Sequence, residues 1–204
     1  MLRLKIPPGN PQSALQQGSR SVLAQCSRAY AGLSAEQALG WTALGSTITR
    51  TDRVGNTYSL SGIDAFTLVN RWRLYMGLSL ALSAIDVEAA PFLSDLTFDF
   101  HDDTFDIDWT APDPTGAGTL MFIQSALVKP SRTIHASDYS FLQQATDPSG
   151  GTLSVNAAMT AKYPQFDFTA HEADGWRLGI KITMVSATGW PGIPQSVEGV
   201  ILSP

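Results

Sequence analysis

The chain has 204 residues, of which 44% are hydrophobic and 15% are charged, with 17 glycines, 12 prolines and a formal net charge of −5. This balance excludes a long disordered chain, a coiled coil and a collagen-like repeat, and the length suits one large domain or two small ones. No apolar run reaches the roughly 18 residues of a membrane span, and residues 1–8 lack the apolar stretch of a secretion signal. We therefore expect a soluble protein made in the cytosol.

Charge is divided unequally along the chain. Residues 1–82 carry eight basic and three acidic side chains, a net +5, whereas residues 83–204 carry five basic and fifteen acidic ones, a net −10. Opposite charge on two halves favours pairing within the chain, head-to-tail association of copies, or an anionic partner for the basic half; the alternative is a mildly basic surface that touches nothing. The interface candidates of this half are Arg20, Arg28, Arg50, Arg53, Arg71 and Arg73.

The spacing of apolar residues changes near residue 83 from a helical period to a strand period, which predicts a helical module followed by a β module. The first helix is predicted to begin at Asn10-Pro11, because Asn caps free amides and Pro suits the first helical position. Its apolar stripe includes Tyr30 and the single cysteine, Cys26. One cysteine excludes an internal disulfide, so we expect Cys26 to be a small core residue.

Two more helices are predicted in this module. One begins at Ser34, which stands in capping-box register with Gln37, and carries Trp41 on its apolar side. A small hairpin or an extended segment that turns at residues 52–56 follows. The next helix begins at Ser61 and is apolar around most of its circumference, so we expect it to be buried on more than one side.

The rest of the chain predicts an antiparallel β-sandwich. Its predicted strands are 96–100, 104–110, 119–128, 139–145, 153–161, 176–187 and 195–202. Seven short strands separated by Gly, Pro and Asp clusters are typical of the immunoglobulin or fibronectin type III kind. The expected fold class is therefore α+β. We expect a helical docking module with a small hairpin at 1–82, a linker at 83–94, and the Ig-like sandwich at 95–204.

Carboxylates alternate with aromatic residues in the first two predicted strands. Period-2 geometry places the candidate interface residues Asp99, Asp106 and Asp108 on the face opposite the aromatic side chains. Such a face could be simply solvated, could dock on a basic partner, or could hold Ca²⁺. No spacing matches an EF-hand loop, and we expect neither a metal nor a cofactor.

No group of residues in the sequence combines an acid, a base and a nucleophile. None of the three histidines has a second histidine at i+3 or i+4, and no nucleophile elbow, P-loop or dinucleotide fingerprint occurs. We therefore expect no enzyme and no catalytic, cofactor-binding or metal-ligating residue. Trp190, in a Gly- and Pro-rich loop, is a candidate contact for a partner or a sugar.

The helical module resembles a group of uncharacterised phage and prophage proteins through three motifs that together cover about residues 10–75. The residues that carry the resemblance are Asn10-Pro11, Ser13, Gln16, Arg20, Leu33-Ser34, Gln37, Trp41, Leu60-Ser61-Gly62, Ala65-Phe66 and Asn70. Proteins of this group typically finish with a fibronectin-like β domain. The resemblance carries no catalytic residues.

The resemblance implies a bacteriophage virion structural protein that makes protein–protein contacts with other virion proteins and with copies of itself. We favour a capsid-associated cement or decoration protein, because the chain is small and lacks tail-fibre repeats. A tail, baseplate or connector component is the close alternative. A carbohydrate-binding adhesion module, in which Trp190 contacts a host-surface glycan, is the rival from another class. Neither a membrane nor a nucleic acid is expected as a partner.

Overall fold

The chain divides into two compact units, Met1–Ile85 and Asp86–Pro204, and combines helices with antiparallel sheets in an α+β fold. The structure is a computed structural model that describes residues 14–52, 54–87, 93–101, 104–110, 119–146, 151–166 and 175–201. Within these ranges, no helix has the length and apolar character required to cross a membrane. The first unit is called the helical unit below, and the second the β unit.

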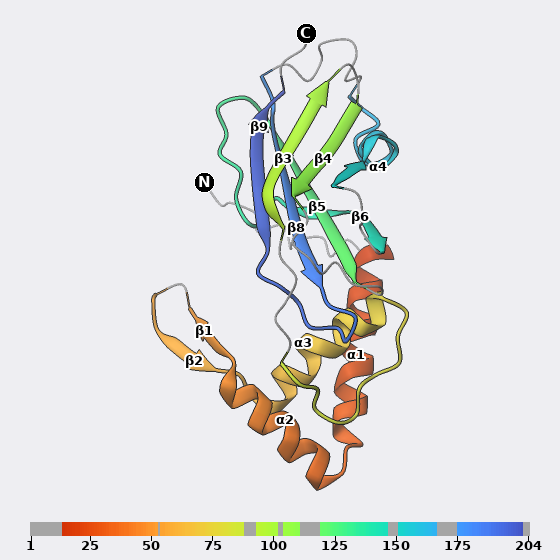
Figure 1. Ribbon diagram of the computed structural model, residues 1–204, viewed down its shortest axis with the longest axis vertical. Helices are drawn as coiled ribbons and strands as arrows, with labels where there is room; N and C mark the ends of the chain where they lie inside the picture. Colours follow the sequence, from red (N-terminus) through yellow and green to blue (C-terminus); the bar gives the residue numbers. More distant parts are fainter. Residues whose placement is uncertain are drawn as a thin grey trace, which may run out of the picture. The chain divides into compact units, whose positions relative to one another are not determined.

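Within its described residues, the helical unit contains three helices and a short hairpin (Figure 1). Its elements are α1 (Ala14–Ala31), α2 (Ala35–Thr47), β1 (Thr49–Thr51), β2 (Thr57–Ser59) and α3 (Gly62–Tyr75). The hairpin turns where it was predicted, because the Asp52 carboxylate accepts hydrogen bonds from the backbone N–H groups of Val54 and Asn56. The predicted first-helix start at Asn10-Pro11 lies outside the described residues.

Both predicted helix caps are confirmed. The Ser34 hydroxyl accepts from the Gln37 backbone N–H at 3.2 Å, while the Gln37 side chain accepts from the Ser34 N–H at 3.0 Å, which completes a capping box. At α3, the Ser61 hydroxyl accepts from the Asp64 backbone N–H. These local hydrogen bonds satisfy amides that have no partner within the helix, so they fix where each helix begins.

The core of the helical unit is built around two aromatic side chains. Trp41 and Phe66 are fully buried, and their rings meet edge to face with centroids 5.2 Å apart. Tyr30 from α1 packs on the other side of Phe66 at 5.5 Å in the same manner. Cys26 lies on α1, one turn before Tyr30, and is fully buried, as predicted for a core residue. All three helices thus contribute to one small core.

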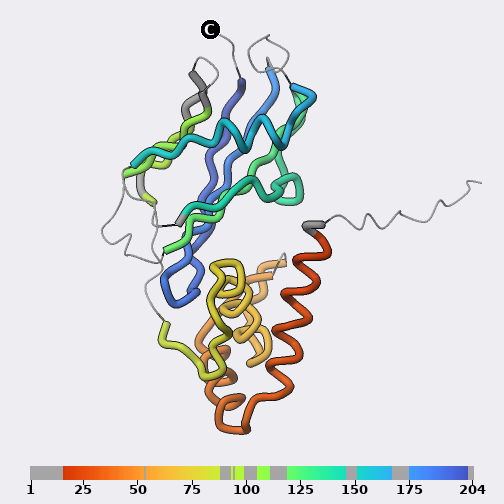
Figure 2. Tube along the Cα trace, turned by 90° about the vertical axis from the view of Figure 1, so that its right-hand side faces the viewer, coloured from red at the N-terminus to blue at the C-terminus, as the bar shows by residue number. Residues whose placement is uncertain are grey.

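The segment after α3 is tied to the helices of its own unit; residues 78–85 are called the strap. The buried Asn70 side chain donates to the Ala81 carbonyl oxygen at 3.1 Å and accepts from the Ala81 N–H at 2.6 Å. The Trp41 indole N–H donates to the Leu82 carbonyl oxygen at 2.8 Å. The strap can be followed in yellow-green after the helices in Figure 2. These hydrogen bonds close the helical unit with backbone that belongs to no regular element.

The β unit contains seven strands in two sheets and one short helix within its described residues. Its elements are β3 (Ser94–His101), β4 (Thr104–Thr110), β5 (Leu120–Val128), β6 (Ser140–Thr146), β7 (Thr152–Ser154), α4 (Asn156–Lys162), β8 (Arg177–Val185) and β9 (Gln195–Val200). One sheet has the order β3-β4-β7 and the other the order β6-β5-β8-β9, with every described pairing antiparallel.

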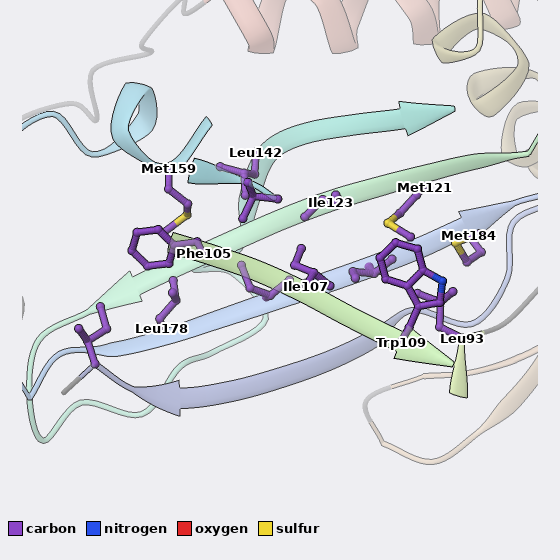
Figure 3. Packing of buried hydrophobic residues seen from close by; sticks show 14 residues of the cluster. Leu93, Phe105, Ile107, Trp109, Met121, Ile123, Leu142, Met159, Leu178 and Met184 are labelled. Carbon is purple, nitrogen blue, oxygen red and sulfur yellow. The ribbon is translucent and has the colours of Figure 1, made fainter. Parts of the chain in front are cut away.

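The two sheets share one hydrophobic core (Figure 3). On β4, the side chains of Phe105, Ile107 and Trp109 are buried while those of Asp106 and Asp108 are partly exposed, as the alternation predicted. The facing sheet contributes buried side chains from β5 and β8, among them Met121, Ile123, Leu178 and Met184. The aromatic face of the acidic hairpin therefore packs against the four-stranded sheet.

The predicted strand at 153–161 is wrong. The chain forms only the short strand β7 there and then the helix α4. Val155 and Met159, four residues apart, are both buried in the core, which is a helical spacing. The Asn156 side chain also accepts from the Phe105 backbone N–H, so tertiary contacts fix the point where strand gives way to helix.

The β unit begins earlier than the predicted boundary at residue 95. Leu93, predicted as linker, is 1% exposed within the core, and its backbone N–H donates to the Gln195 side chain. Residues 83–87 form neither helix nor strand. The described part of the predicted linker is thus divided, since its first residues continue the strap and its last ones join the sheet.

Candidate functional site

The charge of Arg50 acts on Arg71 in the helical unit; the two residues are called the basic pair below. Arg71 lies on α3 with its guanidinium carbon 5.2 Å from the centroid of the Trp72 ring. Its Nε is buried and has no hydrogen-bond partner within the described part of the chain. Burial lowers the pKa of Arg71, and the neighbouring charge of Arg50 lowers it further. Arg71 is therefore a cation that has lost part of its hydration and whose Nε has gained no hydrogen-bond partner among the described residues.

The acidic residues of the helical unit do not neutralise this pair. Asp52 is held by the backbone of the hairpin turn, and the Asn56 hydrogen bonds lower the pKa of its carboxyl. Asp64 caps α3 with Ser61, and Glu36 is exposed in the first turn of α2. No carboxylate among the described residues forms an ion pair with either arginine. The unit has no further acidic residue from which a counter-charge could come.

The other candidate arginines are dispersed. Arg73 donates from Nε to the Ser79 carbonyl oxygen at 2.8 Å and so helps to hold the strap. Arg20 and Arg28 are exposed on α1. Arg53 lies outside the described residues. The structure therefore brings together Arg50 and Arg71 out of the six arginines singled out from the sequence.

The acidic candidates lie on the three-stranded sheet. Asp106 and Asp108 share the outer face of β4, and the Thr152 hydroxyl donates to the Asp108 carboxylate at 2.6 Å. The backbone of Asp99 pairs in register with Asp106 across β3 and β4; its side chain lies outside the described residues. Strands β3, β4 and β7 contain no lysine or arginine. We call the outer face of β4, with Asp106 and Asp108, the acidic face.

The described residues hold no group of three or more His, Cys, Asp or Glu side chains placed to bind a metal ion. Trp190, the other candidate, is partly buried in the loop between β8 and β9. Its backbone N–H donates to the Ser186 hydroxyl at 3.0 Å, and its carbonyl oxygen accepts from the Ser186 N–H at 2.9 Å. The loop is thus closed on itself around Trp190.

A cluster that the sequence did not reveal joins α4 to the four-stranded sheet. The Lys162 ammonium donates to the Ser140 carbonyl oxygen at 2.7 Å, to the Ser125 hydroxyl at 2.8 Å and to the Ser125 carbonyl oxygen at 3.2 Å. The Tyr163 hydroxyl lies 3.0 Å from the Ser125 hydroxyl. Because these residues are far apart in sequence and lie on different elements, no local spacing could have indicated the cluster.

A serine hydroxyl beside a desolvated lysine is the geometry of a nucleophile and its base in Ser–Lys hydrolases. Ser125, however, has no exposed surface, and all three N–H donors of Lys162 are directed to acceptors. A reacting carbonyl could not reach this hydroxyl in the present arrangement. The contacts fit a structural tie that fastens α4 across β5 and β6.

We expect Lys162 to make the stability of the β unit rise in mildly alkaline solution. Burial lowers the pKa of Lys162 from 10.5 to about 8, so between these values the unfolded chain binds more protons than the folded one, and the free energy of unfolding increases with pH. Lys162→Met should remove this rise, whereas the exposed Lys129→Met should keep it. Urea unfolding at a series of pH values measures both, and parallel curves for Lys162→Met and the wild type would contradict the assignment.

Five of the described residues that carry the sequence resemblance belong to the framework of the helical unit. Ser34 and Ser61 cap helices, Trp41 and Phe66 form the core, and Asn70 holds the strap. The comparisons with known proteins add no relative, since no family model and no curated protein matches the chain.

Proposed function

We propose that the chain is a bacteriophage virion structural protein, capsid-associated as a cement or decoration protein, in which the helical unit docks on neighbouring subunits. The observation that carries the proposal is the basic pair, a half-buried Arg71 with Arg50 and no carboxylate partner among the described residues of its unit. A cation removed from water without a counter-charge costs stability unless a partner supplies one. This deficit is expected of a surface that is completed by assembly.

A second feature supports docking by the same unit. Several large apolar side chains remain exposed on it, including Leu39 at 69%, Val54 at 85% and Tyr58 at 50%. Single exposed apolar residues are ordinary on a protein surface, but a small unit with this many has unused area for contacts. The resemblance of its framework to phage and prophage proteins gives the proposal its biological setting.

We propose further that the β unit is a sandwich of the fibronectin type III kind. Seven strands divided into sheets of three and four around one core support this assignment. The chain places its first two strands in one sheet and the next two in the other, then returns for β7 before ending with β8 and β9. Such a unit presents a rigid two-layer body, which suits display or bridging between subunits.

Particle composition tests the proposed function. Phage particles from a lysate in which the chain is produced would be separated into capsids and tails, and the chain would be quantified in each fraction by mass spectrometry. We expect many copies on capsids. Recovery with tails would support the tail, baseplate or connector alternative instead, and absence from both fractions would contradict a virion role.

A further inference from the structure

The counter-charge that the basic pair lacks is present in excess on the other unit of the same chain. Residues 83–204 carry fifteen acidic and five basic side chains. The acidic face is the place where described carboxylates gather on a sheet without lysine or arginine, so its charges are not neutralised by cross-strand partners within β3, β4 or β7. One end of the chain thus has a surplus of the charge that the other end lacks.

We propose that the chain associates head to tail, with the basic pair of one copy bound to the acidic face of a second copy. Arg71 and Arg50 would receive the carboxylates of Asp106 and Asp108. An arginine guanidinium suits this contact, because its planar fork can bind a carboxylate through two parallel hydrogen bonds and loses little hydration. The Trp72 ring beside the Arg71 guanidinium further restricts its orientation.

The acidic face is built to remain in place when it is contacted. Asp106 and Asp108 stand on β4 between two paired strands, and Phe105, Ile107 and Trp109 anchor the opposite face of that strand in the core. The Thr152 hydroxyl fixes one carboxylate through its hydrogen bond to Asp108. Carboxylates held on a central strand lose less side-chain entropy on binding than carboxylates on a mobile loop.

Each copy carries both surfaces, so association in this sense is heterologous: it closes into a ring or continues as a chain of copies. The inference deepens the proposed function, because it names a partner for the docking surface of the helical unit. It is nevertheless tested on purified protein alone, so a failure of self-association and an absence from phage particles are separate results.

Matched charge variants test the contact. The basic-side variant combines Arg50→Glu with Arg71→Met, which keeps an apolar stem at the half-buried position, and the acidic-side variant combines Asp106→Lys with Asp108→Lys. Lys129→Glu and Glu36→Lys are controls that change exposed charges elsewhere. Thermal unfolding measurements check that each variant folds. If the double acidic variant does not fold, Asp106→Asn serves as a milder replacement.

Sedimentation velocity over a range of protein concentrations measures the association. We expect the wild type to self-associate at about 0.01 M salt and to dissociate near 1 M, as the Debye length falls from about 30 Å to about 3 Å. Each double variant should raise the Kd of self-association by about tenfold or more. The controls should keep the Kd within about threefold of the wild-type value. An equimolar mixture of the two double variants should regain association, because the unaltered acidic face of the basic-side variant can bind the unaltered basic pair of the acidic-side variant.

Three results would overturn the inference. Monomeric wild-type protein at low salt would mean that the charges pair within one chain or await a different protein. Association that survives both double variants would place the contact elsewhere. Loss of association in the double variants without recovery in the mixture would show that the substitutions act on folding or on a different surface.

Discussion

Asn70→Ala is expected to destabilise the helical unit by about 2–4 kcal/mol, because it leaves two backbone groups without partners at about 1–3 kcal/mol each. Asn70 is fully buried and holds the strap through both the N–H and the carbonyl oxygen of Ala81. Alanine can replace neither its donor nor its acceptor. The strap is then fastened mainly by Trp41 at Leu82 and by Arg73 at Ser79.

The single cysteine gives a direct measurement of this effect. Cys26 is fully buried in the helical unit, and burial raises the pKa of its thiol, so a thiol reagent reacts only when the unit opens. A loss of 2 kcal/mol or more predicts labelling about 30-fold faster in Asn70→Ala, since each 1.4 kcal/mol is a factor of about ten. Unchanged labelling would mean that the strap contributes nothing to the closed state.

Asn56→Ala is the matched control, because Asn56 is an exposed asparagine of the same unit that bonds only within the hairpin turn. It should leave the labelling rate nearly unchanged. Trp41→Phe keeps most of the aromatic core but removes the indole N–H that donates to Leu82. The double variant Trp41→Phe with Asn70→Ala should lose more stability than either single variant, because the two side chains hold adjacent residues of the strap.

Local signals made much of this fold predictable. The capping box of Ser34 and Gln37 and the cap at Ser61 are short-range patterns, since each hydrogen bond joins residues three apart. The alternation on β4 likewise identified its buried and exposed faces. In these segments local preference and tertiary packing agree, which is why the sequence pattern is reliable there.

Prediction failed where a distant residue decides the local structure. The segment at 153–161 begins with apolar residues at strand spacing. Its helix α4 is nevertheless held by distant hydrogen bonds, from the Phe105 N–H to the Asn156 side chain and from the Lys162 ammonium to Ser125 and Ser140. The end of the strap, residues 83–85, falls in the predicted linker, because residues 83–94 have no strong periodic pattern. The strap's side-chain hydrogen bonds come from residues on α2 and α3 that are 6, 11 and 41 positions away.

The sequence likewise predicts some features of the candidate site and not others. Net charge and its division between the halves follow from the sequence alone, and so does the placement of Asp106 and Asp108 on one face. The electrostatic effect of Arg50 on Arg71 does not, because it depends on how the hairpin and α3 are packed. The lack of a carboxylate partner for Arg71 also required the structure, since three acidic residues were available within the unit.

Gly45→Ala is expected to destabilise the helical unit by about 2–3 kcal/mol, although alanine is the better helix former at most positions. A Cβ at Gly45 would stand 2.6 Å from the Leu60 carbonyl oxygen and 2.9 Å from that of Ser61. Both atoms are backbone, and the Leu60 N–H donates to the Gly45 carbonyl oxygen at 3.1 Å. The chain therefore cannot move aside without losing the hydrogen bond that leads into α3.

Gly40→Ala in the same helix should have the opposite sign. A Cβ there meets only the Ala84 Cβ, at an ordinary contact distance of 3.5 Å, so the gain in helix propensity of about 0.5–1 kcal/mol is retained. Cys26 labelling should accelerate in Gly45→Ala and slow in Gly40→Ala. Equal effects of the two substitutions would show that helix propensity, rather than the approach of residues 60 and 61, governs this unit. Because only the contact environment differs between the two glycines, the pair measures how closely α2 and the start of α3 must approach for the helical unit to close.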